Sequence, residues 1–232
     1  HPSTDYSSVA HDVYIRDTTT GKNKLVTKNL SSSPKSLFWL SSSQLAFDLD
    51  ERGSSKIMQL NTDNLRLSEL ISGFKEQFFL SSANQGDLYG TYVTSNRPGE
   101  VASIKNTKLE RLTEFNELVL GQYDLGKTHE VNYQAPDGTQ IQGWYITPPN
   151  FDESKTYPLI LVIHGGPHAM YRPAFNYSWH QFASDGYVVL FTNPRGSTGY
   201  GSEFANVIDN DYPGAGDLSD LLAGVDYVTK KG

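Results

Sequence analysis

The pattern of apolar and polar residues changes near residue 124. Before that point, short apolar stretches alternate with polar residues, and turns rich in Ser, Asn and Gly separate them. After it, longer apolar runs without alternation are followed by segments with helical spacing. A period of two predicts strands with one covered face, whereas uninterrupted apolar runs separated by helices predict a parallel sheet covered on both faces. We therefore expect an all-β part followed by an α/β part.

A repeat of about 43 residues organises the all-β part, with copies that start at Asp12, Ser55 and Gly99. Each copy is a strand, a polar turn and a second strand, and another strand pair lies between successive copies. Four short strands per unit suit a β-propeller blade. Residues 1–124 therefore predict a partial β-propeller with two whole blades and the end of a third. The aromatic residues in the first strand of each blade are expected to pack between blades: Phe38, Trp39, Phe78 and Phe79.

The α/β part begins with two alternating stretches on either side of Asp137 and Gly138. They predict an antiparallel hairpin with a two-residue turn of positive φ. Apolar strands are then expected over residues 159–163 and from residue 188, with a helix over residues 175–187 between them. A second helix is expected from Asp217, whose side chain suits the N-cap position.

The first apolar strand of this part runs directly into His164, Gly165, Gly166 and Pro167. Loops at the carboxyl ends of parallel strands are where α/β sheets place their chemistry. Two glycines there let backbone N–H groups approach a ligand, as stabilising an oxyanion requires. From these residues alone, half of an oxyanion hole and a tight turn with His164 hydrogen-bonded beneath it are equally good interpretations.

The stretch from His164 to Ile208 resembles the first part of the catalytic domain of the prolyl oligopeptidase family of serine peptidases, especially its acylaminoacyl-peptidase and dipeptidyl-peptidase branches. Two motifs carry the resemblance: HGGPH, residues 164–168, and NPRGSTGYG, residues 193–201. The family places a β-propeller before an α/β-hydrolase domain. The resemblance implies that residues 1–124 are propeller blades and that residues 125–232 are the N-terminal half of an α/β-hydrolase domain. It also implies hydrolysis of peptide bonds in oligopeptides, with the Gly166 N–H as an oxyanion donor and Gly165 in the same loop.

The chain departs from the family in one large respect, because it contains no G-x-S-x-G nucleophile motif. The family's acid and histidine follow that motif, so His164 and His168 are not expected to act as the general base. We expect a fragment without the catalytic triad that is inactive by itself. The alternative is a non-catalytic module in which propeller blades bind a peptide and the hydrolase half is vestigial. In the resembled fold, residues 159–163 would form an exposed strand edge, which predicts self-association or a complementing chain.

No cofactor or metal is expected. Pro167 interrupts the His164-x-x-x-His168 spacing, and no carboxylate follows closely, which disfavours a metal site. The glycines in residues 196–201 have the spacing G-x-x-G-x-G, which is not the dinucleotide fingerprint. Arg195 is expected to have a structural role, with Glu203 or Asp217 as its partner. Three nearby acidic residues predict a solvated loop and a helix cap rather than a cation site: Asp209, Asp211 and Asp217.

Composition narrows the possible partners. The 19 Lys and Arg residues against 26 Asp and Glu give a net charge of −7, and no basic run exists, which argues against nucleic acid. No apolar segment approaches the roughly 20 residues that span a bilayer, and no signal peptide is visible at the start. The absence of cysteine excludes disulfides. We expect a soluble protein of unassigned compartment that takes a peptide substrate.

Overall fold

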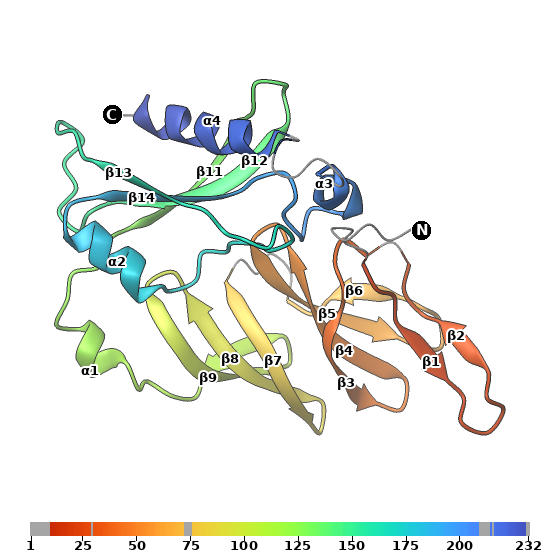
Figure 1. Ribbon diagram of the computed structural model, residues 1–232. Helices are drawn as coiled ribbons and strands as arrows, with labels where there is room; N and C mark the ends of the chain where they lie inside the picture. Colours follow the sequence, from red (N-terminus) through yellow and green to blue (C-terminus); the bar gives the residue numbers. More distant parts are fainter. Residues whose placement is uncertain (1–9, 29, 72–75, 209–213, 215, 231–232) are drawn as a thin grey trace.

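The computed structural model describes residues 10–28, 30–71, 76–208, 214 and 216–230. Strands in these residues form four sheets, and the sheets fall into two groups (Figure 1). Three antiparallel sheets come from the first part of the chain, and one mixed sheet with helices comes from the second.

The antiparallel sheets are propeller blades. A two-stranded sheet pairs β1 (Tyr14–Arg16) with β2 (Asn23–Leu25). A four-stranded sheet follows in the order β3 (Lys35–Ser41), β4 (Gln44–Glu51), β5 (Ser54–Asn61) and β6 (Leu67–Glu69). The next has the order β7 (Gln77–Asn84), β8 (Asp87–Thr94), β9 (Arg97–Lys105) and β10 (Lys108–Arg111). The chain thus has two four-stranded antiparallel sheets and one two-stranded sheet, and each is a local meander that the alternation pattern encodes.

The blades pack through alternating side chains. Along β4, Phe47 contributes to a core shared with β1 and β2, while Ala46 joins a core shared with β7, β8 and β9. The expected aromatic packing holds for Phe38 and Phe78, which lie in or against the second core. It is wrong for their neighbours, since Trp39 and Phe79 point to the opposite face and are 53% and 39% exposed.

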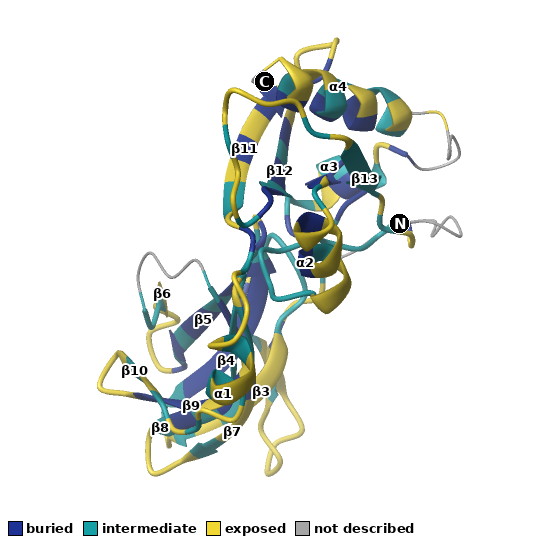
Figure 2. Cartoon of the chain, turned by 90° about the vertical axis from the view of Figure 1, so that its left-hand side faces the viewer, coloured by how far each residue is buried: buried dark blue, intermediate teal, exposed yellow. Residues whose placement is uncertain are grey.

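The α/β part is built on a four-stranded sheet with the order β11-β12-β14-β13. The strands are β11 (Thr128–Gln134), β12 (Gln140–Ile146), β13 (Leu159–Val162) and β14 (Val188–Asn193), and β13 runs parallel to β14. Helix α2 (Tyr177–Ser184) packs on the face that carries Val189 and Phe191, and α4 (Asp217–Thr229) packs on the face of Val188 and Leu190. Both faces are therefore covered, as the uninterrupted apolar pattern of β14 predicts. Figure 2 shows buried residues along β4, β5 and β9 in one part and along β12 in the other.

Three local expectations need correction. Residues 135–139 connect β11 and β12, and the backbone hydrogen bond from the Ala135 N–H to the Thr139 carbonyl encloses a turn of three residues rather than two. Of these residues only Gly138 has positive φ. Asp217 is not an N-cap, since Gly216 occupies that position and the Asp217 carboxylate accepts a bond from the Gly214 N–H instead. Two short helices were not expected: α1 (Glu117–Leu120) and α3 (Ser202–Asn206).

Candidate functional site

The loop of residues 164–172 leaves the carboxyl end of β13, and it is here named the HGG loop. Gly165 and Gly166 are exposed within it. Gly166 has a φ of +141°, and a Cβ at this position would lie 2.8 Å from the backbone nitrogen of His168. A Cβ on Gly165 would meet no atom within 4 Å. Glycine is therefore needed at Gly166 for conformation, whereas Gly165 faces open space.

The backbone N–H groups of Gly165 and Gly166 have no protein acceptor among the described residues. Among the described residues, neither the Gly165 nor the Gly166 N–H donates a hydrogen bond to a carbonyl or a side chain. Most backbone N–H groups in folded proteins are paired with protein or water. Two adjacent donors without a protein acceptor, in exposed residues beyond the end of β13, can receive a negatively charged oxygen.

Hydrogen bonds of two histidines, His164 and His168, fix the HGG loop. The ring of His164 places Nε2 at 3.0 Å from Ser197 Oγ and Nδ1 at 3.2 Å from the Gly165 carbonyl oxygen. His168 Nδ1 lies 2.9 Å from the Gly196 carbonyl oxygen. Burial lowers the pKa of His164 and outweighs the contact with the Gly165 carbonyl, which acts in the opposite direction. The ring is therefore neutral near pH 7. Both rings thus tie the HGG loop to residues 194–197.

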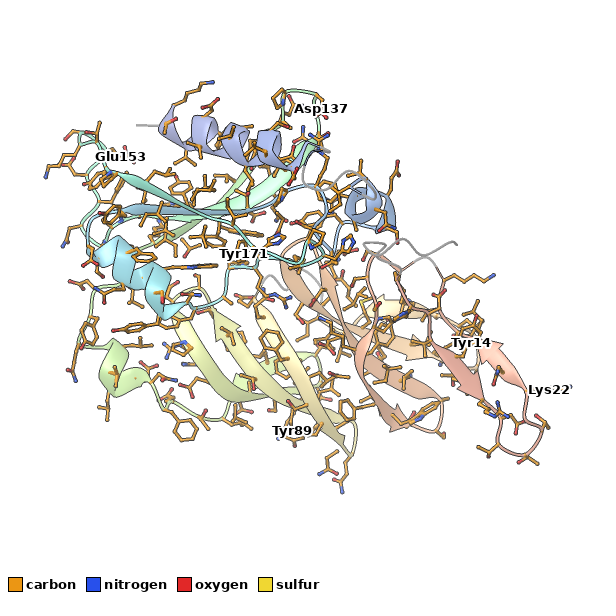
Figure 3. All side chains as sticks on the ribbon, in the orientation of Figure 1. Tyr14, Lys22, Tyr89, Asp137, Glu153 and Tyr171 are labelled. Atoms are coloured by element: carbon orange, nitrogen blue, oxygen red, sulfur yellow. The ribbon has the colours of Figure 1, made fainter. Side chains whose placement is uncertain are left out.

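The loop after β14 forms the second side of the site. Asn193 at the end of β14 accepts the Tyr171 N–H at 2.7 Å and donates to the Tyr171 carbonyl at 2.9 Å. The Thr198 N–H also donates to the Ala169 carbonyl at 2.9 Å. Tyr171 packs edge-on against His164. It lies between the four-stranded β11-β12-β14-β13 sheet and the blades (Figure 3).

Two of the three glycines in residues 196–201 serve close packing, since a Cβ on Gly201 would meet no atom within 4 Å. Gly196 and Gly199 have positive φ, and a Cβ on them would meet Ile208 Cδ1 at 2.4 Å and Met170 Sδ at 2.4 Å, respectively. The space beside each is therefore filled by protein.

Arg195 has a structural role, but the expected partners are wrong. Its guanidinium binds the fully buried carboxylate of Asp220 through Nη2 at 2.6 Å and Nε at 3.0 Å, and it also contacts Asp137 at the hairpin tip. The bond to Asp220 raises the pKa of Arg195 despite burial. Asp220 lies one turn beyond Asp217 and faces the sheet, which explains why it replaces Asp217. Asp209 and Asp211 lie outside the described residues.

Comparison with known proteins finds similar peptidases. The sequence profile of the prolyl oligopeptidase family matches residues 173–232. An uncharacterized peptidase of Bacillus subtilis, YuxL, is 35% identical over 191 residues, which cover 78% of this chain and 28% of that protein. A probable dipeptidyl-peptidase 5 of Emericella nidulans is 31% identical over 237 residues, covering 96% of this chain and 32% of that protein.

Solved structures of similar fold are also peptidases. The acylaminoacyl peptidase of Pyrococcus horikoshii superimposes with a TM-score of 0.82 at 25% identity, covering 99% of this chain and 35% of that one. An acylaminoacyl peptidase in complex with Z-Gly-Gly-Phe-chloromethyl ketone gives a TM-score of 0.84 at 26% identity, with the same coverage. The fold is that of propeller blades followed by part of an α/β-hydrolase domain. Residues 173–232 match the prolyl oligopeptidase family, and the whole chain is similar in fold to the solved acylaminoacyl peptidases. The chain spans about a third of the length of the relatives it matches.

In the part of the chain that the structure describes, no helix is long and apolar enough to cross a membrane.

Proposed function

We propose that the chain forms part of a serine-type peptidase that hydrolyses peptide bonds in oligopeptides, with the Gly166 N–H as one oxyanion donor and Gly165 in the same loop. The observation that carries the proposal is the pair of bare, exposed amides at the end of β13. The match to the family supports the class of reaction. We place the boundary between the propeller blades and the hydrolase half at residue 124.

The proposed reaction is acyl transfer. A serine Oγ attacks the peptide carbonyl carbon while a histidine takes the serine proton, and the carbonyl oxygen becomes an oxyanion. The Gly166 N–H and a second amide stabilise this charge. The C–N bond then breaks, the amine leaves with the proton that the histidine returns, and water releases the acyl group. Removing one such donor typically costs about 3 to 4 kcal/mol of transition-state stabilisation.

The nucleophile is proposed to come from outside these 232 residues, because they contain no G-x-S-x-G. The chain by itself is then inactive. The direct test extends the reading frame beyond Gly232 and searches for G-x-S-x-G within about 20 residues, since a short strand separates helix and elbow. The polypeptide so defined should be labelled by a fluorophosphonate at that serine.

A matched pair of glycine variants tests the role of the loop. Gly166→Ala keeps the N–H but adds a Cβ that the φ of +141° does not accommodate. The N–H should therefore be displaced, and the rate of fluorophosphonate labelling should fall by about 100-fold or more, as when an oxyanion donor is lost. Gly138→Ala is the control, because Gly138 also has positive φ, at +90°, but lies in open space in the β11–β12 loop. Equal labelling of both variants would argue against the assignment. A polypeptide that binds peptides tightly and is never labelled would favour the non-catalytic module instead.

A further inference from the structure

The HGG loop lies against the blades as well as against the hydrolase sheet. On the hydrolase side, residues 193–198 hold it through the contacts described above. On the other side lie the last two residues of β4 and the turn that leads to β5. These residues, 50–53, are here named the blade turn. The two sides contact alternate residues of one segment, Ala169 to Arg172, which begins three positions after the proposed oxyanion donor. Residues 193–198 bond to Ala169 and Tyr171, and the blade turn contacts Met170 and Arg172.

The strongest contact across this junction joins Asp50 to Arg172. The guanidinium makes a bidentate pair with the carboxylate, with Nη1–Oδ1 at 3.2 Å and Nη2–Oδ2 at 3.0 Å. Both side chains are largely buried, at 10% and 19% exposed. Lys35 adds a second cation at 2.5 Å from Asp50, and the Arg172 guanidinium also lies over the ring of Phe79 at 5.6 Å. Burial raises the pKa of Asp50, but Arg172 and Lys35 outweigh burial and lower it, so the carboxylate is charged.

Two backbone groups of the blade turn add further contacts. The Arg52 N–H donates to the Gly199 carbonyl at 3.0 Å, and the Gly53 N–H approaches Met170 Sδ at 3.4 Å. The turn is itself fixed within the blades, because Gln77 Nε2 donates to the Gly53 carbonyl at 3.0 Å. A rigid element of one part therefore contacts both loops that shape the site of the other.

We propose that Asp50 is a positioning residue for the oxyanion donor, acting through Arg172 to fix the HGG loop and thereby the direction of the Gly166 N–H. This rests on the proposed function. Oxyanion stabilisation depends on donor geometry more than on donor number, because the donors must be aimed before charge develops. Gly166 and Arg172 are only six positions apart in the chain, so release of one end loosens the other. The propeller thus contributes to catalytic geometry through a defined ion pair.

The test combines amide exchange with kinetics. Asp50→Asn removes the charge and keeps the shape, and Arg172→Met keeps the packing over Phe79 while it removes the guanidinium. Arg172→Lys is the conservative variant. Arg111→Met is the matched control, because Arg111 pairs with Glu114 and Glu117 and makes no contact with the blade turn or the HGG loop among the described residues.

Hydrogen exchange is measured on the 232-residue chain in peptides that cover residues 164–172, with peptides of β11 and β12 as the monitor of folding. Asp50→Asn and Arg172→Met should each accelerate exchange in the HGG loop by about tenfold or more and leave the monitor unchanged, since local openings respond to single broken contacts. Arg172→Lys should recover part of the protection. Unchanged exchange of the HGG loop in both variants would overturn the proposal.

Kinetics are measured on the polypeptide of the extended reading frame with a peptide substrate that it cleaves. The same two variants should lower kcat about tenfold or more at nearly constant KM, as expected for an interaction used in the transition state, and Arg111→Met should leave both within twofold. A change in KM alone would contradict positioning. If the parent polypeptide is neither active nor labelled by fluorophosphonate, the proposed function fails, while the exchange result still decides whether Asp50 fixes the loop.

Discussion

Gly53 in the blade turn lies so close to Trp144 in β12 that a Cβ on the glycine would come within 2.3 Å of the indole Cη2. The contact brings a propeller blade against the hydrolase sheet without any side chain on the blade side. Gly53 also has a φ of +69°. The junction therefore depends on a glycine at this turn for two separate reasons.

Gly53→Ala should destabilise the chain by about 2 to 4 kcal/mol, because overpacking adds to the cost of a left-handed alanine. Gly86→Ala is the matched control. Gly86 lies in the β7–β8 turn of the next blade with a φ of +90° and has no atom within 4 Å of an added Cβ. Urea unfolding of both variants separates the clash from the backbone strain. Equal losses would show that the contact with Trp144 contributes nothing.

Asp220→Asn should cost about 3 to 5 kcal/mol of unfolding free energy, because it leaves the Arg195 guanidinium buried without its main partner. Asp137→Asn should cost at most about 1 kcal/mol, since the Asp137 side chain is 51% exposed. Both carboxylates contact the guanidinium of Arg195, so the two substitutions compare the loss of a buried partner with the loss of an exposed one. Similar losses from the two substitutions would contradict this account of Arg195.

The environment of Glu100 predicts that the free energy of unfolding decreases at acid pH. Its buried carboxylate accepts bonds from Thr113 Oγ1, the Phe115 N–H, and both the backbone N–H and the side-chain amide of Asn116. Burial raises the pKa of Glu100, but these donors outweigh burial and lower it to about 2. A depressed pKa stabilises the fold above the ordinary value near 4.5, and that stabilisation is lost as the pH falls from 4.5 toward 2.

Urea midpoints of the parent and of Glu100→Gln, measured between pH 7 and pH 2, test this relationship. The gap between the two proteins should be constant above about pH 5 and should close as the pH approaches 2. Glu114→Gln is the control at an exposed position of the same segment, and it should follow the parent throughout. A gap that does not change with pH would show that the charge of Glu100 is unimportant.

The edge of the hydrolase sheet predicts self-association of the isolated chain. Among the described strands, β13 pairs only with β14, and Ile163 at its end is 57% exposed. Unpaired edges with apolar side chains promote pairing between chains. Sedimentation should show concentration-dependent association that Ile163→Lys weakens, since an edge lysine opposes strand addition. A monomer at all concentrations would contradict the expectation.

Local patterns in the sequence predicted the parts of the fold that depend on near neighbours. Alternation and repeat length were enough for the blades, and the apolar runs with helical spacers were enough for β13, α2 and β14. The HGG motif indicated the loop at the end of β13. The sequence did not indicate the pairing of Asp50 with Arg172, because 122 residues separate them and neither residue stands out within its own segment. Arg195 was assigned the wrong partner for a related reason, since the helical register that turns Asp220 inward is set by packing on the sheet.

The assignment of Gly166 is tested most directly by a crystal structure of the fluorophosphonate adduct of the polypeptide that continues beyond Gly232. The phosphonyl oxygen mimics the oxyanion, and it should lie about 2.7 to 3.1 Å from the Gly166 nitrogen. An adduct whose oxygen points away from the HGG loop, with the Gly166 N–H bonded to a protein carbonyl, would contradict the assignment.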